Sequence, residues 1–99
     1  MHVISRKALT EFWAVHAQAR APLSAWYRIV TEAKFGDFAG VRRTFNSADV
    51  VARDFVVFNA ISFRIVTAIR YNRGKLYIRH VFTHAEYDRW SARLKKGLS

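Results

Sequence analysis

The two stretches on either side of Asn72-Arg73-Gly74 constrain the fold more than any other feature of this sequence. Residues 63–71 and 75–82 are rich in Val, Ile, Phe and Tyr, which is typical of strands. The Asn-Arg-Gly between them is typical of a tight hairpin turn. If Arg73 and Gly74 form a two-residue loop, Asn72 lies opposite Lys75, and this register decides which face of the hairpin each side chain occupies.

In this register one face of the hairpin is almost wholly apolar, and its members are Phe63, Ile65, Thr67, Ile69, Tyr71, Leu76, Ile78, His80 and Phe82. The other face carries three arginines, and its members are Arg64, Val66, Ala68, Arg70, Tyr77, Arg79, Val81 and Thr83. A slip of one residue would mix the two sets, so the apolar pattern supports the register. It predicts that Arg64 lies opposite Thr83 and Arg79 opposite Ala68. It also places His80 in the core with a satisfied imidazole.

The rest of the chain supplies helices and further strands. The expected elements before the hairpin are a strand over residues 1–4, a helix from about Ser5 to His16 or Ala19, a second helix from about Pro22 to Lys34, a short helix at 37–43, and a strand at 55–59. After the hairpin, Thr83-His84-Ala85-Glu86 fits a capping box that starts a last helix. The order β-α-α-β-β-β-α predicts a single α+β domain over residues 1–99, in which a helical hairpin covers one face of a small antiparallel sheet.

The charge distribution predicts a polyanionic partner. The chain carries a net charge of +10, and residues 60–99 hold nine Lys or Arg against two Asp or Glu, which leaves +7 in that part. Arginine outnumbers lysine by 12 to 5, and a guanidinium fork suits bidentate contacts to phosphate. Nucleic acid is therefore the leading candidate. The bases expected to hold its backbone are Arg70, Arg73, Lys75, Arg89, Arg93, Lys95 and Lys96.

Several classes of protein are disfavoured by composition. The chain has no cysteine, so it can form neither disulfides nor thiolate metal sites. No apolar run approaches the roughly 20 residues of a membrane span, and the N-terminus lacks the pattern of a signal peptide. Four dispersed histidines without a carboxylate cluster make a poor metal site. We expect a cytoplasmic protein with no metal, no cofactor and no membrane partner.

The corner between the last strand and the last helix is the candidate catalytic site. The predicted register gathers Arg64, Arg79, His84 and Tyr87 there. Metal-independent RNA cleavage by the 2′-hydroxyl needs a base, cations for the phosphorane and an acid for the leaving oxygen. Histidine suits either proton role, and arginine supplies charge. The plainer interpretation is that the arginines only track RNA, that the histidine is a surface residue, and that the tyrosine packs under the helix.

Four segments of the sequence resemble the HigB family, and they are distributed so that the resemblance extends over essentially the whole chain. They are Met1–Leu9, Phe55–Asn59, Phe63–Val66 and Tyr71–Asp88. The resemblance implies the RelE/ParE-like fold and a toxin of a type II toxin–antitoxin pair, which degrades mRNA, often on translating ribosomes. It also implies neutralisation by a cognate helix-turn-helix, HigA-like antitoxin. Carried over, the family's basic sheet residues and tyrosine support Arg64, Arg79 and Tyr87, with His84 as the family's own polar residue at the corner.

One turn departs from the family's pattern. Relatives usually carry a longer turn with two glycines, an asparagine and a basic residue, whereas this chain has only Ala60-Ile61-Ser62 between Asn59 and Phe63. The shorter turn is expected to tighten the hairpin or to shift the start of the next strand, and Arg64 with it.

The leading hypothesis is therefore an mRNA endoribonuclease acting without metal. One alternative is a non-enzymatic ParE-like toxin that binds a protein target such as gyrase. Another is a plain basic RNA-binding module.

Overall fold

The computed structural model describes residues 1–97, and within them the helices and strands form an α+β fold. The elements are β1 (His2–Ile4), α1 (Lys7–Val15), a 3-10 turn (Ala17–Ala19), α2 (Arg20–Glu32), α3 (Phe38–Thr44), β2 (Asp49–Val51), β3 (Phe55–Ala60), β4 (Phe63–Arg70), a second 3-10 turn (Tyr71–Arg73), β5 (Lys75–Thr83) and α4 (His84–Lys95). All the expected helices and strands are present. β2 is a further strand that the sequence pattern did not delimit.

The five strands form one sheet in the order β1-β5-β4-β3-β2. The neighbours from β2 to β5 pair antiparallel, as expected. β1 pairs parallel with β5, so the sheet is mixed and the prediction of a purely antiparallel sheet was wrong. Three α-helices intervene between β1 and the other strands, and a long connection of this kind permits parallel pairing.

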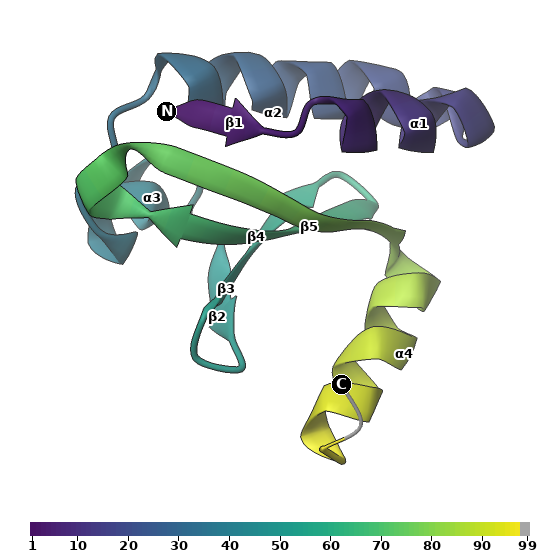
Figure 1. Cartoon of the computed structure of the whole chain (residues 1–99). Coiled ribbons are helices and arrows are strands. Elements are labelled where there is room, and N and C mark those ends of the chain that lie inside the picture. Colours follow the sequence, from purple (N-terminus) through teal and green to yellow (C-terminus); the bar gives the residue numbers. More distant parts are fainter. Residues whose placement is uncertain (98–99) are drawn as a thin grey trace.

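The helical hairpin covers one face of the sheet, which we call the inner face. Figure 1 shows α1 and α2 side by side on that side, with α4 on the opposite side. The main hydrophobic cluster joins Leu9 of α1 and Leu23 of α2 to Phe58, Ile65 and Leu76 of the sheet, and all five are fully buried. The inner face thus holds the core that the apolar pattern predicted. Among the described residues, no helix is both long enough and apolar enough to cross a membrane.

The β4–β5 connection is longer than the sequence analysis predicted. Arg70 lies opposite Lys75, so four residues connect the strands and Asn72 does not pair with Lys75. Residues 71–73 form a 3-10 turn, and Gly74 follows with a φ of 64°. This left-handed conformation favours glycine because glycine has no Cβ to clash. The glycine ends the turn, whereas the prediction had placed it inside a two-residue loop.

A bulge in β5 changes the register halfway along the hairpin. Thr67 pairs with Ile78, but Val66 pairs with His80, so Arg79 has no partner on β4. A bulge of this kind adds one residue to one strand and reverses the side-chain alternation beyond it. The four-residue connection shifts the pairing near the turn, and the bulge shifts it again beyond Thr67, so the predicted pairs of Arg64 with Thr83 and of Arg79 with Ala68 were wrong. Arg64 lies opposite Phe82, and Ala68 lies opposite Tyr77.

The bulge also moves His80 and Phe82 to the face opposite the helical hairpin, which we call the outer face. The placement of His80 in the core was wrong: the residue is exposed, and its ring stacks on Phe82 with centroids 5.0 Å apart. Val81 and Thr83 take the inner-face positions instead. Their partners Ile65 and Phe63 belong to the main cluster.

The last helix covers part of the outer face. Its start is the predicted capping box, since the Thr83 hydroxyl accepts from the Glu86 N–H and the Glu86 carboxylate accepts from the Thr83 N–H at 2.8 Å. Trp90 is buried against Val57 and Val66 in a second, smaller cluster. The half-buried side chains packed on this cluster are Val51, Phe55, Phe82, Tyr87 and Leu94. The prediction placed helices over one face only. The outer face is instead covered in part, by α4.

Candidate active site

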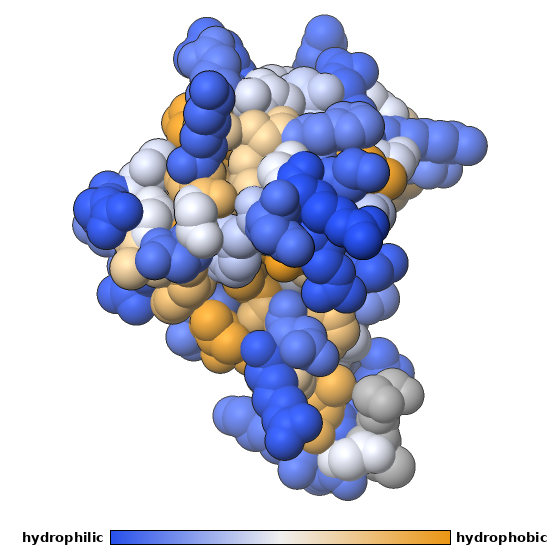
Figure 2. All heavy atoms as spheres, turned by 60° about the vertical axis from the view of Figure 1, so that its left-hand side comes forward, coloured by the Kyte–Doolittle hydropathy of each residue, from blue (hydrophilic) through white to orange (hydrophobic). Residues whose placement is uncertain are grey.

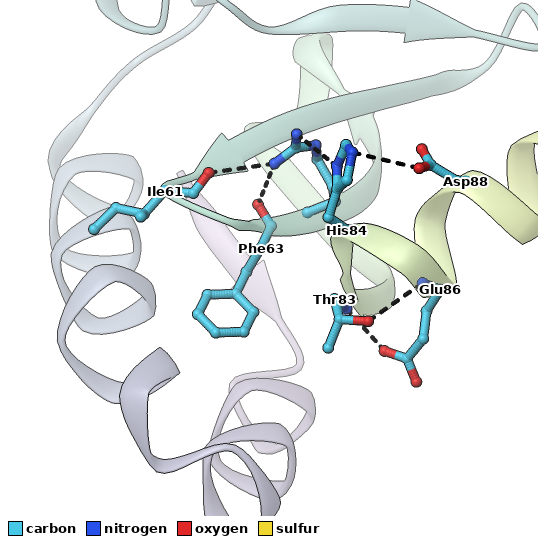
Figure 3. Close-up of polar contacts among 7 residues, drawn as sticks. Ile61, Phe63, Thr83, His84, Glu86 and Asp88 are labelled. Atoms are coloured by element: carbon cyan, nitrogen blue, oxygen red, sulfur yellow. Dashed lines mark hydrogen bonds and ion pairs between the residues drawn. The ribbon is translucent and has the colours of Figure 1, made fainter.

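The corner between β5 and α4 holds Arg64 by three hydrogen bonds (Figure 3). Its Nη1 donates to the carbonyl oxygens of Ile61 at 3.3 Å and Phe63 at 3.1 Å. Its Nη2 lies 3.0 Å from His84 Nδ1. A guanidinium has five N–H donors, so two of them have no partner among the described residues. The side chain is thus oriented by its neighbours and still has donors for a ligand.

The tight β3–β4 turn supplies one of these contacts. Ala60 pairs with Phe63, so only Ile61 and Ser62 form the turn. Ile61 has a φ of 59°, a left-handed conformation that a β-branched residue rarely adopts. Its carbonyl oxygen nevertheless points to Arg64. The shortened turn, the one departure from the family's pattern, therefore takes part in positioning the arginine.

His84 lies between Arg64 and an acid. Its Nε2 is 3.3 Å from Asp88 Oδ2, one helical turn further along α4. Arginine can only donate, so Nδ1 accepts from it and Nε2 carries the proton that faces Asp88. The two contacts together fit the Nε2–H tautomer of the imidazole. The His84 and Asp88 side chains are 60% and 61% exposed, so both are within reach of a ligand in solvent.

Asp88 is a site residue that the sequence analysis missed. The signal was present, because Asp88 follows His84 by four residues and such pairs are neighbours on a helix surface. In the charge pattern, Asp88 stands out only as one of the two acids in the basic segment 60–99.

Tyr87 lies on α4 and packs against the small cluster of Val57, Val66 and Trp90. It is half-buried, and its ring centroid lies 5.9 Å from that of Trp90. Burial raises the pKa of Tyr87 above its ordinary value of 10.0, and the negative charge of Asp49 raises it further, while Arg64 acts in the opposite direction. The hydroxyl therefore keeps its proton at neutral pH. Tyr87 therefore packs beside Trp90, as the plainer interpretation expected, and its role in cleavage stays a prediction.

Arg79 does not join the other three predicted residues. It lies in the bulge, three residues before Phe82, the partner of Arg64, which corresponds to roughly 10 Å along β5. Its guanidinium lies over the Tyr77 ring at 5.4 Å from the centroid. None of its described contacts reaches Arg64, His84 or Tyr87. The structure thus brings Arg64 and His84 into contact and leaves Arg79 further along the sheet. Tyr87 has no described hydrogen bond to either residue, and its link to the corner is the charge of Arg64 acting on its hydroxyl.

The residues predicted to hold an RNA backbone lie mostly at the surface. The exposed members are Arg70, Arg73, Arg89, Arg93, Lys95 and Lys96, whereas Lys75 is half-buried. Figure 2 shows hydrophilic side chains over much of one face, including the lobe that α4 forms at the bottom. Among residues 1–97, no three His, Cys, Asp or Glu side chains cluster as metal ligands would.

Similarity to known proteins places the chain in a family. The model of HigB toxins, described as the RelE-like toxic component of a toxin–antitoxin system, matches residues 19–90. The mRNA interferase toxin HigB of Escherichia coli strain K12 is 30% identical over 96 residues, and the alignment covers 93% of this chain and 92% of the relative. The mRNA interferase HigB proteins of Escherichia coli O157:H7 and Shigella flexneri match with the same identity and coverage. The chain therefore belongs to the HigB family of RelE-like toxins.

Proposed function

We propose that this chain is the toxin of a type II toxin–antitoxin pair and cleaves mRNA, on the translating ribosome, by metal-independent attack of the RNA 2′-hydroxyl. The observation that carries the proposal is the guanidinium of Arg64, held beside an imidazole with two N–H groups left for a phosphate. The names of the relatives, which describe them as mRNA interferases, support the same reaction. The mixed five-stranded sheet is compatible with the RelE/ParE-like fold.

Arg64 would bind the scissile phosphate. Its two remaining N–H groups match the two non-bridging oxygens, and a fixed donor stabilises charge that develops on the phosphorane. Because Ile61 and Phe63 hold Nη1 through backbone oxygens, the guanidinium would stay anchored at Nη1 while Nη2 exchanges His84 for the phosphate.

His84 would act as the base. When Arg64 turns from Nδ1 to the phosphate, that nitrogen is free to accept the 2′-hydroxyl proton. The 2′-oxygen then bonds to phosphorus, and the bond from phosphorus to the 5′-oxygen breaks. Asp88, which faces Nε2–H, stabilises the imidazolium that forms, in the role that an acid has beside a catalytic histidine.

Tyr87 would supply the proton for the leaving 5′-oxygen. Its raised pKa keeps the hydroxyl protonated until the oxygen acquires charge. The products are a 2′,3′-cyclic phosphate and a 5′-hydroxyl, so atoms and protons balance. For Arg79 we propose contact with a neighbouring phosphate, since its described contacts lie away from the corner. A cognate helix-turn-helix antitoxin is the expected neutralising partner.

The test is to add purified protein to a cell-free translation reaction and map the new RNA 5′-ends. Wild-type protein should produce cuts within translated codons, and His84→Ala should slow them by about 10²- to 10⁴-fold. The matched control is His2→Ala, because His2 is exposed on β1 and should leave the rate unchanged. Undiminished cutting by the His84 variant contradicts the proposed mechanism.

Two further reactions test the finer parts. If the ribosome contributes, ribosome-free RNA should be cut more slowly than translated RNA. If no metal takes part, adding EDTA to the ribosome-free reaction should leave the rate of cutting unchanged. Whatever cutting remains there should be as sensitive to His84→Ala as cutting in the translation reaction. Growth arrest with intact RNA would instead favour a protein target such as gyrase.

A further inference from the structure

A groove lies along α4 and includes Phe82 of β5, the residue that faces Arg64 across the hairpin. It is lined by Phe82, Glu86, Arg89, Trp90, Ala92 and Arg93, and its volume is about 490 Å³. Sites for small ligands commonly span about 300–1,000 Å³. The proposed cleavage mechanism uses none of these six side chains.

Aromatic rings form one wall of this groove. Phe82 and Trp90 line it with centroids 5.8 Å apart. His80 is not one of the lining residues, but its imidazole packs against both rings, 5.0 Å from Phe82 and 5.5 Å from Trp90. The His80 and Phe82 rings are nearly parallel, with an interplanar angle of 10°. Partial desolvation lowers the pKa of His80 below its ordinary value of 6.5, and the charges of Arg79 and Arg93 lower it further. At neutral pH all three rings are therefore uncharged, in a strongly basic protein.

The polar side chains around the rings fit a nucleotide. Arg89 and Arg93 come from the α4 side and carry charge suited to phosphates. Glu86 uses Oε1 to accept from the Thr83 N–H, and its other oxygen has no partner among the described residues. That oxygen can accept from an exocyclic amine of a base. Rings for stacking, cations for the backbone and an acceptor for a base edge together match single-stranded nucleic acid.

We propose that this groove is a subsite for an unstacked nucleobase of the RNA substrate, adjacent to the phosphate at Arg64. The register supports the adjacency, because Phe82 lies directly opposite Arg64 on the outer face. Facing residues of an antiparallel pair are about 5 Å apart, so a base on Phe82 and a phosphate on Arg64 belong to neighbouring positions of one strand. The inference rests on the proposed function for its ligand, and it assigns the groove a role in substrate recognition.

Binding of an RNA that cannot be cleaved tests the inference apart from the reaction. The probe is a short, fluorescently labelled 2′-O-methyl oligoadenylate, compared with an abasic chain of the same length, and the readout is fluorescence anisotropy at fixed salt. Stacking on an aromatic side chain should make wild-type protein bind the base-bearing probe about 5- to 150-fold more tightly than the abasic one. Equal affinity for the two probes, or no binding of either, overturns the inference.

Variants locate the preference. The double variant His80→Leu/Phe82→Leu should bring the ratio of the two affinities close to one. Tyr27→Leu should keep the wild-type ratio, because Tyr27 packs with the main cluster on the far side of the sheet. Arg93→Gln should weaken both probes by the same factor, since it removes charge and no ring. A double variant that keeps the wild-type ratio contradicts the proposed subsite.

A single variant covers the case in which the double variant does not fold. His80 is exposed, so His80→Leu should fold and should still lower the ratio severalfold. An unchanged ratio in this variant overturns the inference. Base-dependent binding without cleavage of natural RNA would leave the subsite standing and would contradict the proposed function, so the two failures are distinguishable.

Discussion

The inner face of the sheet lies under α1 and α2, whereas the outer face is covered only in part, by α4 (Figure 1). On the inner face, Leu76, Ile65 and Phe58 are fully buried among other apolar side chains. On the outer face only Val57, Val66 and Trp90 are buried in the corresponding cluster, and the hydrophobic side chains packed around them are only partly buried. The same sheet thus has one side built for stability and one that leaves donors, rings and cations free.

This division explains why the candidate chemistry gathers on one side. A guanidinium on the inner face would need a partner for every N–H, because burying an unpaired charge is costly. At the outer corner Arg64 is held by backbone oxygens and by His84 while solvent still reaches the pair. Partial cover by α4 therefore orients the side chains without using up their hydrogen-bonding capacity.

Truncation of an inner-face residue should give the largest effect and tests the difference in stability. Leu76→Ala should lower the free energy of unfolding by about 2–5 kcal/mol, because it removes a fully buried side chain and leaves a cavity. Leu94→Ala is the matched change on the outer face, where the side chain is only half-buried, and should cost less than half as much. Urea denaturation followed by circular dichroism measures both. Equal losses would contradict the contrast between the two faces.

Removal of the arginine at the corner should affect activity and leave stability nearly unchanged. Arg64→Ala should reduce the rate of RNA cleavage by about 10²- to 10³-fold, since it deletes an oriented donor to the phosphorane. Arg70→Ala removes the same charge from an exposed position on the same strand and should cost less than about tenfold, through weaker RNA binding. Initial rates with purified RNA measure both. If the two variants lose the same activity, Arg64 contributes only general charge.

The inner face was also the more predictable of the two. Alternating apolar residues in β4 sufficed to place Ile65 and Ile69 in the core, and a Thr-x-x-Glu spacing sufficed to find the start of α4. Hydrophobic burial is non-directional, so a pattern of residue types is enough to locate it. For the same reason the helices and four of the five strands were predictable from the sequence.

The outer face depends on a feature that residue types do not specify. A bulge inserts one residue, and nothing in the run Ile78-Arg79-His80 marks which residue lacks a partner. Beyond the bulge, Val81 and Phe82 are both apolar, so either can face the core. The placement of His80 failed for this reason, and Arg79 was assigned to the wrong neighbours. Arg64 and His84 were still predicted to meet, because both lie next to the capping box of α4.

The attachment of α4 should depend on pH through Glu86. The hydrogen bond from the Thr83 N–H lowers the pKa of Glu86 below its ordinary value of 4.5. An acid with a lowered folded-state pKa contributes stability above its unfolded pKa, and this contribution is lost as the pH falls through the folded value. Glu86→Gln keeps the capping geometry and removes the titration. The loss of stability between neutral pH and about pH 3.5 should therefore be smaller in this variant, by less than about 1 kcal/mol.

Urea denaturation at both pH values measures this difference. Glu11→Gln is the control, because Glu11 is exposed on α1 and has no described capping role. An identical pH dependence in wild type and Glu86→Gln would mean that the capping carboxylate does not help to attach the helix.

The smallest effect is expected at the tight β3–β4 turn formed by Ile61 and Ser62. Ile61 is 82% exposed and has a φ of 59°, so its side chain gains little from burial and its backbone is strained. The left-handed region costs an ordinary residue about 1–2 kcal/mol, and asparagine tolerates it better. Ile61→Asn should therefore raise the free energy of unfolding by up to about 1 kcal/mol. Because Arg64 contacts the carbonyl oxygen of residue 61 and not its side chain, the rate of RNA cleavage should stay the same. A gain in stability accompanied by a loss of activity would show that the strained turn serves the outer face through more than this carbonyl.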